Sequence, residues 1–193
     1  GRVLAAFHEA MPAHDRWLNL GEKLPAEITR WAGQEFLLPR LPLRYDAWGI
    51  RAGWKAPVLA RMAADVSLPA GTHRVVLRAR GLSRLWMDRT LIASTKPHTG
   101  DSGGHDPVKP VPAPPLPGLR PVGFGMQEVT GEVVAKAGTP IRFVLETMVG
   151  GKRYRSDPGE LTVAVSTADG RSFVVLQPAG AETEPVALTD AAV

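Results

Sequence analysis

The densest set of potential metal ligands in this sequence lies in residues 98–106, HTGDSGGHD. His98, Asp101, His105 and Asp106 supply two imidazoles and two carboxylates. Zinc and calcium both accept ligands of these kinds. The spacing matches no known metal motif, however, and the intervening glycines constrain the backbone loosely. We therefore treat these residues as weak metal candidates, with a solvated polar loop as the alternative, and we predict no bound metal and no cofactor.

Catalytic chemistry finds less support. The GDSGG stretch, residues 100–104, superficially resembles the nucleophile loop of chymotrypsin-like serine proteases. Those enzymes also need an upstream histidine and aspartate, and here proline-rich sequence follows the loop. Asp157 and Glu160 are close in sequence, but they suit a turn between strands better than a glycosidase pair. The sequence has no GxSxG elbow and no cysteine. We predict that the chain is not an enzyme.

Aromatic and cationic residues suggest ligand binding instead. Trp48 and Trp54 lie in the glycine-punctuated stretch YDAWGIRAGWKAP, where they could stack on sugar rings or pack inside. Tyr154 and Arg155 lie in VGGKRYRSDPGE, which could meet a sugar or an anionic polymer or be a solvated hairpin tip. Arg80, in the break RGLS, could hold an anionic group or pair with an acid. These five residues are the predicted ligand-binding candidates.

Composition limits the classes of partner. The 193 residues are 44% hydrophobic, enough for one domain with a sizeable core, and 20 glycines and 18 prolines favour a turn-rich fold. A net charge of +4 is too small to indicate nucleic-acid binding. The absence of cysteine excludes disulfides. No apolar run approaches the roughly 20 residues that span a bilayer. We predict no nucleic-acid partner and no membrane span.

From about residue 34, apolar and polar residues alternate with the period of β-strands. One set of faces is predicted to be apolar and inward: Met62, Ala64, Val66, Leu68, Val75, Leu77, Ala79, Ile141, Phe143 and Leu145. The opposite faces carry Arg61, Ala63, Asp65, Arg74, Arg78, Arg80, Arg142, Val144 and Glu146. The sequence also predicts a hairpin with Asp88 and Arg89 at its turn, and a second hairpin turn at residues 168–171, ADGR.

Three segments fall outside this alternation. Residues 2–11, RVLAAFHEAM, place apolar side chains at helical spacing, and the segment PAEITRWAG continues a helical or irregular region. Residues 96–121 are too long and too rich in proline for a hairpin loop, so they form either a functional loop or a cover over an edge. Residues 185–193, with Thr189 or Asp190 as N-cap, resemble the start of a helix. These ends lead us to expect a module of a longer protein.

The order of the strand segments resembles the PA-fourteen (protective-antigen-like) family of β-sandwich domains. Three stretches carry the resemblance: residues 68–94, LPAGTHRVVLRARGLSRLWMDRTLIAS, then GEVVAKAGTPIRFVLE, then ELTVAVS. Residues 84–88, RLWMD, match the family's RLWVD, and residues 136–138, KAG, match its later turn. The similarity extends over about residues 62–177. It implies a β-sandwich and is poorly specific for function.

The resemblance also implies what this chain lacks. Sugar-binding members hold calcium with two adjacent aspartates just before RLWVD, and this pair aligns here with Arg80 and Gly81. A guanidinium near the cation position opposes calcium binding, because like charges repel. We therefore expect the fold without the calcium site, and we expect the break RGLS to be a bend in the scaffold.

Together, these observations predict a mostly-β protein: an antiparallel β-sandwich with a short helical N-terminal extension and a long Pro/Gly-rich loop. The expected divisions are the extension at 1–33, the sandwich at 34–178 with its loop at 96–121, and a tail or linker at 179–193. The resemblance implies a non-catalytic interaction module of an exported multidomain bacterial protein, extracellular, at the cell surface or periplasmic, that binds carbohydrate or another surface polymer. The alternative is a scaffold domain without a ligand, packed against neighbouring enzyme or haem-bearing domains.

Overall fold

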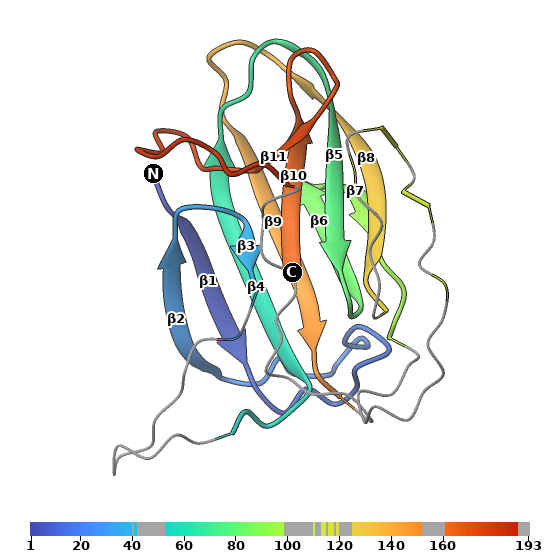
Figure 1. The fold of residues 1–193 in the computed structure, drawn as a ribbon. Helices are drawn as coiled ribbons and strands as arrows, with labels where there is room; N and C mark the ends of the chain where they lie inside the picture. Colours follow the sequence, from blue (N-terminus) through green and yellow to red (C-terminus); the bar gives the residue numbers. More distant parts are fainter. Residues whose placement is uncertain are drawn as a thin grey trace.

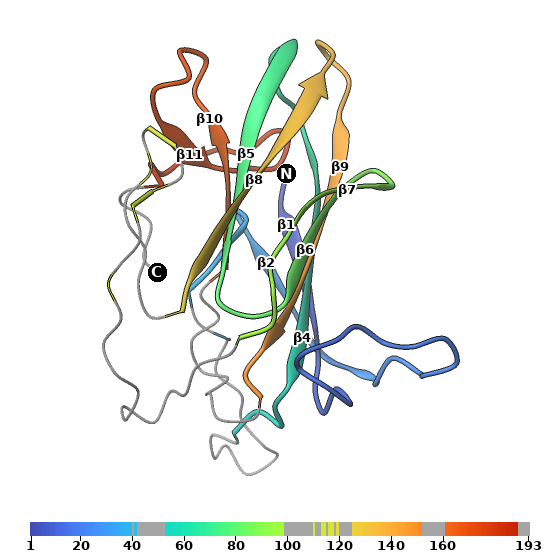
Figure 2. The same ribbon diagram turned by 90° about the vertical axis from the view of Figure 1, so that its right-hand side faces the viewer.

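The computed structural model describes residues 1–39, 41, 53–98, 110, 113–114, 116–117, 119, 125–151 and 161–188. Within these residues the chain forms two antiparallel β-sheets that pack face to face, which confirms the predicted β-sandwich (Figure 1; Figure 2). No described residue is α-helical. The described part of the chain accordingly has no apolar helix of the length that a membrane crossing requires.

One sheet has six strands in the order β2-β1-β4-β9-β6-β7. Its strands are β1 (Val3–His8), β2 (Glu27–Gly33), β4 (Val58–Val66), β6 (Ser83–Met87), β7 (Thr90–Ser94) and β9 (Ile141–Val149). The second sheet has the order β11-β10-β5-β8, and the short β3 also pairs with β10. Its strands are β3 (Leu37–Leu38), β5 (Gly71–Ala79), β8 (Gln127–Ala135), β10 (Leu161–Ser166) and β11 (Phe173–Val175).

The core lies between the two sheets and follows the predicted alternation. Met62 of β4, Leu77 of β5 and Phe143 of β9 are fully buried in one cluster that both sheets share. Side chains at every second position point inward because successive residues of a strand alternate between its faces. The outer faces of the strands therefore carry the remaining positions, among them the predicted Arg61 and Glu146.

The predicted N-terminal helix is wrong, because these residues are strands. Val3–His8 forms β1, which lies between β2 and β4 in the six-stranded sheet, and the segment PAEITRWAG contains β2. Val3, Ala5 and Phe7 are all buried, at a spacing of two. The spacing of Val3 and Phe7 also fits a helical period, and the alanines between them fit a helix or a strand equally well. The sequence pattern therefore did not distinguish the two structures. Pairing with β4 on one side and β2 on the other stabilises the strand.

The break RGLS is a corner that carries the chain from one sheet to the other, from β5 to β6. Thr95 Oγ1 donates to the carbonyl of Gly81 at 2.7 Å and accepts from the amide of Ser83 at 2.8 Å. The hydroxyls of Ser83 and Thr147 lie 2.6 Å apart. These buried bonds fix the path of the corner, since buried polar groups are stable only when paired.

Both predicted hairpins are present. Asp88 and Arg89 join β6 to β7, and Asp88 takes a positive φ of 50° there. Residues 168–171 join β10 to β11. In the first turn the Asp88 amide donates to the Arg142 carbonyl at 2.7 Å, which anchors the hairpin to β9. Turn chemistry was therefore a dependable signal in this sequence.

The outer face of the five-stranded sheet is covered in part. Val76, Ala164 and Phe173 form a buried cluster with Leu119 and Leu188, and Leu116 packs against it. On the same face Arg78 is completely buried, with Nε and Nη2 donating to Glu128 Oε1 at 2.8 and 2.5 Å. The alternation correctly predicted that Arg78 lies on the face opposite the core. It did not predict that this face is partly covered, so that the Arg78 side chain is buried.

Candidate binding pocket

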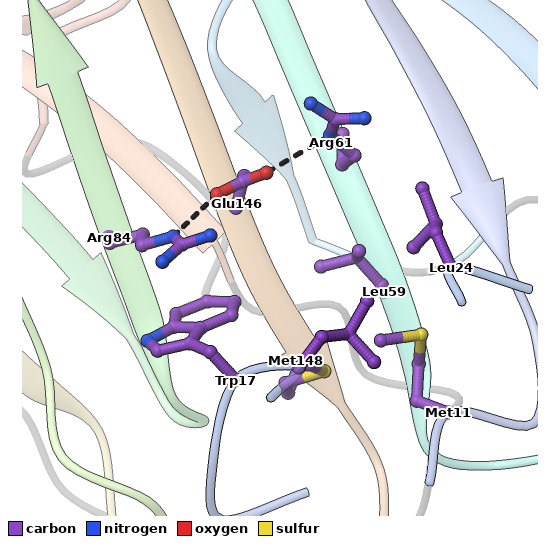
Figure 3. A pocket seen from close by; sticks show the side chains of 9 residues that line it. Met11, Trp17, Leu24, Leu59, Arg61, Arg84, Glu146 and Met148 are labelled. Atoms are coloured by element: carbon purple, nitrogen blue, oxygen red, sulfur yellow. Dashed lines mark hydrogen bonds and ion pairs between the residues drawn. The ribbon is translucent and has the colours of Figure 1, made fainter. Parts of the chain in front are cut away.

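A pocket of about 250 Å³ lies on the outer face of the six-stranded sheet (Figure 3). Its floor comes from β4, β9 and β6, and its wall comes from the chain between β1 and β2. The lining residues are Met11, Trp17, Leu18, Leu24, Leu59, Arg61, Arg84, Glu146 and Met148. Figure 3 shows the charged groups at one end and the two methionines with Leu24 and Leu59 at the other. The pocket therefore has a polar end and an apolar end.

The wall is a loop that holds its own shape. Arg16 and Glu22 form a two-pronged ion pair, with nitrogen–oxygen distances of 2.6 and 2.8 Å. The amide of Asn19 donates to the same carboxylate at 2.7 Å. The hydrogen bonds from Arg16 and from the Asn19 amide lower the pKa of Glu22 to about 2. Glu22 is therefore ionised at neutral pH and closes the loop across six residues.

The same loop is pinned to the sheet by an apolar cluster. Met11, Leu59, Leu82 and Met148 are buried together, and Trp17 and Leu18 pack against them. The amide of Met11 also donates to the carbonyl of Pro57 at 3.0 Å. Burial of these side chains outside the main core holds the wall against β4 and β9. The pocket is thus a product of loop docking rather than of the sandwich alone.

The polar end is a carboxylate between two guanidinium groups. Glu146 Oε2 accepts from Arg84 Nε at 2.5 Å, and Glu146 Oε1 lies 3.0 Å from Arg61 Nε. The Glu146 side chain is 11% exposed, against 30% for Arg84 and 44% for Arg61. The Nη atoms of both arginines donate no hydrogen bond to any residue that the structure describes. The polar end therefore carries one excess positive charge and unused donors.

Two tryptophans hold the Arg84 guanidinium in place. Its central carbon lies 4.0 Å from the ring centre of Trp17 and 5.4 Å from that of Trp86. Stacking on aromatic faces suits the planar, weakly hydrated guanidinium. With Glu146 on its Nε, Arg84 is oriented before any ligand arrives. Such a group can bind an oxyanion at little cost in side-chain entropy.

The described ligand-binding candidates lie away from this pocket. Trp54 is partly buried against the main core, with its ring centre 5.7 Å from that of Phe7. It contributes to packing and is not a lining residue of the pocket. Arg80 lies at the start of the corner between β5 and β6, where its carbonyl accepts from Gln127 Nε2 at 3.2 Å. The structure therefore does not bring Trp54 and Arg80 together with the pocket residues.

Most remaining candidates lie outside the described residues. These are Trp48, Asp101, Ser102, His105, Asp106, Tyr154, Arg155, Asp157, Glu160, Thr189 and Asp190. Of the metal candidates, His98 alone is among the described residues. Its ring lies beside Gly125, so close that a Cβ atom added to this glycine would be 2.8 Å from His98 Cε1. Within the described ranges no three His, Asp or Glu side chains gather closely enough to hold a metal ion.

Sequence reasoning missed the pocket, although it placed some of its parts. The alternation predicted Arg61 and Glu146 on outward faces, and Arg84 stood in the family-like motif. Their meeting depends on strand register: Arg61 pairs with Glu146, and Glu146 pairs with Arg84. Arg84 and Glu146 are 62 positions apart along the chain. Periodicity gives the face of a residue but not its neighbours across strands.

The same outer face carries an apolar row that crosses all six strands. The register pairs Ala32 with Leu4, Leu4 with Ala63, Ala63 with Val144, Val144 with Trp86 and Trp86 with Leu91. Leu4 and Leu91 are 64% and 47% exposed. The next row towards the pocket contains Arg30, Ala6, Arg61, Glu146, Arg84 and Ser94. An apolar row thus runs beside a charged one.

Comparison with known proteins identifies the fold. No family model matches the sequence, and no curated protein matches it. Among solved structures, a PA14 sugar-binding domain from an RTX adhesin is similar over 93% of this chain and 98% of its own length, at 9% identity and a TM-score of 0.53. The epithelial adhesin 9 A domain from Candida glabrata, solved with Galb1-3GlcNAc, is similar over 95% of this chain and 91% of its own, at 6% identity and a TM-score of 0.52.

An anti-sigma factor domain-containing protein is also similar, at 11% identity and a TM-score of 0.54. This likeness covers 94% of the present chain, which spans about half (48%) of the length of that protein. Identities this low show the fold alone. The chain has a PA14-like β-sandwich fold, which confirms the resemblance to the PA-fourteen family drawn from the sequence.

Proposed function

We propose that this chain is a non-catalytic carbohydrate-binding module of an exported multidomain protein that acts outside the cell. Two solved domains with the same fold support this: one is named as sugar-binding, and the other was solved with a disaccharide. The observation that carries the proposal is the pocket beneath the loop between β1 and β2. This pocket combines a cavity with converging polar groups.

The chemistry of the pocket suits a sugar ring. Sugars present hydroxyl groups and apolar C–H faces together, so their sites need both kinds of partner. Glu146 and the two arginines supply an acceptor and several donors, and Leu59 and Met148 supply an apolar floor. The volume of about 250 Å³ lies below the roughly 300–1,000 Å³ usual for larger ligands. The pocket therefore fits one sugar unit.

The same groups support the non-catalytic part of the proposal. Most glycoside hydrolases use two carboxylates that flank the scissile bond. Glu146 is the one carboxylate among the described lining residues, and both its oxygens face guanidinium groups. Both oxygens of this carboxylate are thus engaged in orienting the arginines. The pocket is suited to binding and not to hydrolysis.

A matched pair of leucine variants tests this site on a polysaccharide array. Leu24 lies at the pocket, so Leu24→Trp should fill it and abolish binding of the sugar that the native chain recognises. Leu20 is fully exposed and does not line the pocket, so Leu20→Trp should leave binding unchanged. Binding of no sugar by the native chain would contradict the proposed function, and binding that survives Leu24→Trp would contradict the site.

The apolar row on the outer face supports a second candidate, a scaffold domain that packs against a neighbouring domain. Exposed apolar residues that adjoin one another across strands often mark interaction surfaces. The chain has no cysteine, so Leu4→Cys introduces a unique thiol in the row. A scaffold role predicts that this thiol reacts with a maleimide in the isolated chain but is protected in the longer protein. The thiol of Val134→Cys, on the exposed side of β8, serves as the control. Equal labelling of Leu4→Cys in the isolated chain and in the longer protein would exclude docking at the apolar row.

A further inference from the structure

We propose that the pocket recognises an acidic sugar, one whose ring carries a carboxylate, with Arg84 and Arg61 donating to that carboxylate. This inference rests on the proposed carbohydrate-binding function and specifies its ligand. It starts from the charge of the polar end, where two guanidinium groups share one carboxylate. One positive charge therefore remains for the ligand to neutralise.

The donors that remain are suited to a second carboxylate. Both arginines meet Glu146 through Nε, and within the described chain their Nη atoms donate no hydrogen bond. A guanidinium presents its N–H groups as a planar fork that matches the two oxygens of a carboxylate. An acidic ligand can thus bind at the Nη atoms without displacing Glu146. A neutral sugar would leave the excess charge uncompensated.

The position of these donors limits where the ligand carboxylate can sit. The Arg84 guanidinium carbon lies 4.0 Å from the ring centre of Trp17 and 5.4 Å from that of Trp86. A ligand carboxylate that forms two parallel hydrogen bonds with this guanidinium must approach in its plane. At 30% exposure the Arg84 side chain is reachable but partly shielded from salt.

The apolar end of the pocket selects for a ring beside the carboxylate. Leu59, Met148 and Met11 are buried beneath the pocket, and Leu24, which is 38% exposed, presents apolar surface beside them (Figure 3). A simple anion such as phosphate would leave this surface exposed to water. A uronate ring would cover it with its C–H face while its carboxylate reaches the arginines.

Polygalacturonate and its fully methyl-esterified form provide matched probes, since they share the same chain of sugar rings and differ in whether each carboxyl group is charged or is a neutral methyl ester. The native chain should bind polygalacturonate at least about tenfold more tightly than the ester, because charge-assisted hydrogen bonds are lost in the ester. Polyglutamate tests whether a peptide carboxylate suffices, and we expect weak binding to it. Titration calorimetry or biolayer interferometry measures all three, each at low and at high salt.

Arginine variants then locate the interaction. Arg84→Gln and Arg61→Gln should each weaken binding of polygalacturonate by about tenfold or more, and Arg84→Lys should restore it only in part, because an ammonium lacks the fork. Arg74→Gln, an exposed position on the other sheet, should change nothing. Two independent pocket variants keep the test decisive if one of them fails to fold, which circular dichroism reveals.

The outcomes separate this inference from the proposed function. Equal binding of the ester and the acid, or of neutral sugars alone, would overturn acidic-sugar recognition while leaving a carbohydrate module. Binding of no sugar would overturn both. Polyglutamate binding as tight as that of polygalacturonate, or a loss in Arg74→Gln equal to that in Arg84→Gln, would show diffuse charge attraction and would also overturn the inference.

Discussion

Replacing Glu128 with alanine should destabilise the fold strongly, because it leaves a guanidinium charge in the interior. The side chains of Arg78 and Glu128 are 0% and 2% exposed, and two N–H groups of Arg78 converge on Glu128 Oε1. Removing one partner of a buried ion pair costs about 3–5 kcal/mol of unfolding free energy. The cost arises because the remaining charge has neither a partner nor water.

The size of this effect can be compared with that at an exposed pair. For a chain of this length 1 kcal/mol corresponds to roughly 2–4 °C in the melting temperature, so Glu128→Ala should lower it by about 6–20 °C. Asp65 pairs with Arg142 at about half exposure for both side chains, so Asp65→Ala should lower the melting temperature far less than Glu128→Ala does. Thermal and urea unfolding followed by circular dichroism would measure both variants.

A double replacement provides the internal check. Arg78→Leu combined with Glu128→Leu removes both charges and keeps apolar volume, so it should be less destabilising than Glu128→Ala alone. A destabilisation by Glu128→Ala no greater than that by Asp65→Ala would contradict a buried charge at Arg78. That result would mean that water reaches Arg78, and the burial of its guanidinium would then be wrong.

Two further predictions concern packing and pH. Gly131→Ala should destabilise the fold by about 1–3 kcal/mol, since the added Cβ would lie 2.4 Å from the carbonyl oxygen of Ile92 in the other sheet. A Cβ added at Gly53 meets nothing within 4 Å, so Gly53→Ala is the control and should leave the urea unfolding curve unchanged. Arg16 holds the pKa of Glu22 at about 2, against 4.5 for the free group. The ionised Glu22 therefore stabilises the fold fully above about pH 4.5, and this stabilisation is lost as the pH falls through 2. The stability difference between the native chain and Glu22→Gln should shrink across that window, and a difference independent of pH would contradict this account.

Local patterns predicted much of the sandwich. The alternation in β4 and β5 gave the inward faces correctly, because the period of two belongs to the strand itself. Asp88 and the ADGR turn placed two hairpins, because turn residues act locally. The N-terminal strand was mistaken for a helix, because Val3 and Phe7 fit both periods and the alanines between them carry little information. Pairing with β4, more than fifty residues away, decided its conformation.

The candidate pocket could not be derived from the sequence, because its residues meet only through tertiary structure. Alternation places Glu146 on an outward face of its strand, but the register of β4, β9 and β6 decides that it lies between Arg61 and Arg84. The loop that brings Trp17 onto Arg84 docks through apolar contacts that no local pattern reveals. The sequence by itself determined the strands, the turns and the likeness to the PA-fourteen fold, since these follow from neighbours along the chain. Only the tertiary structure decided which charges are buried and which meet in a pocket, since these depend on residues that are distant in sequence.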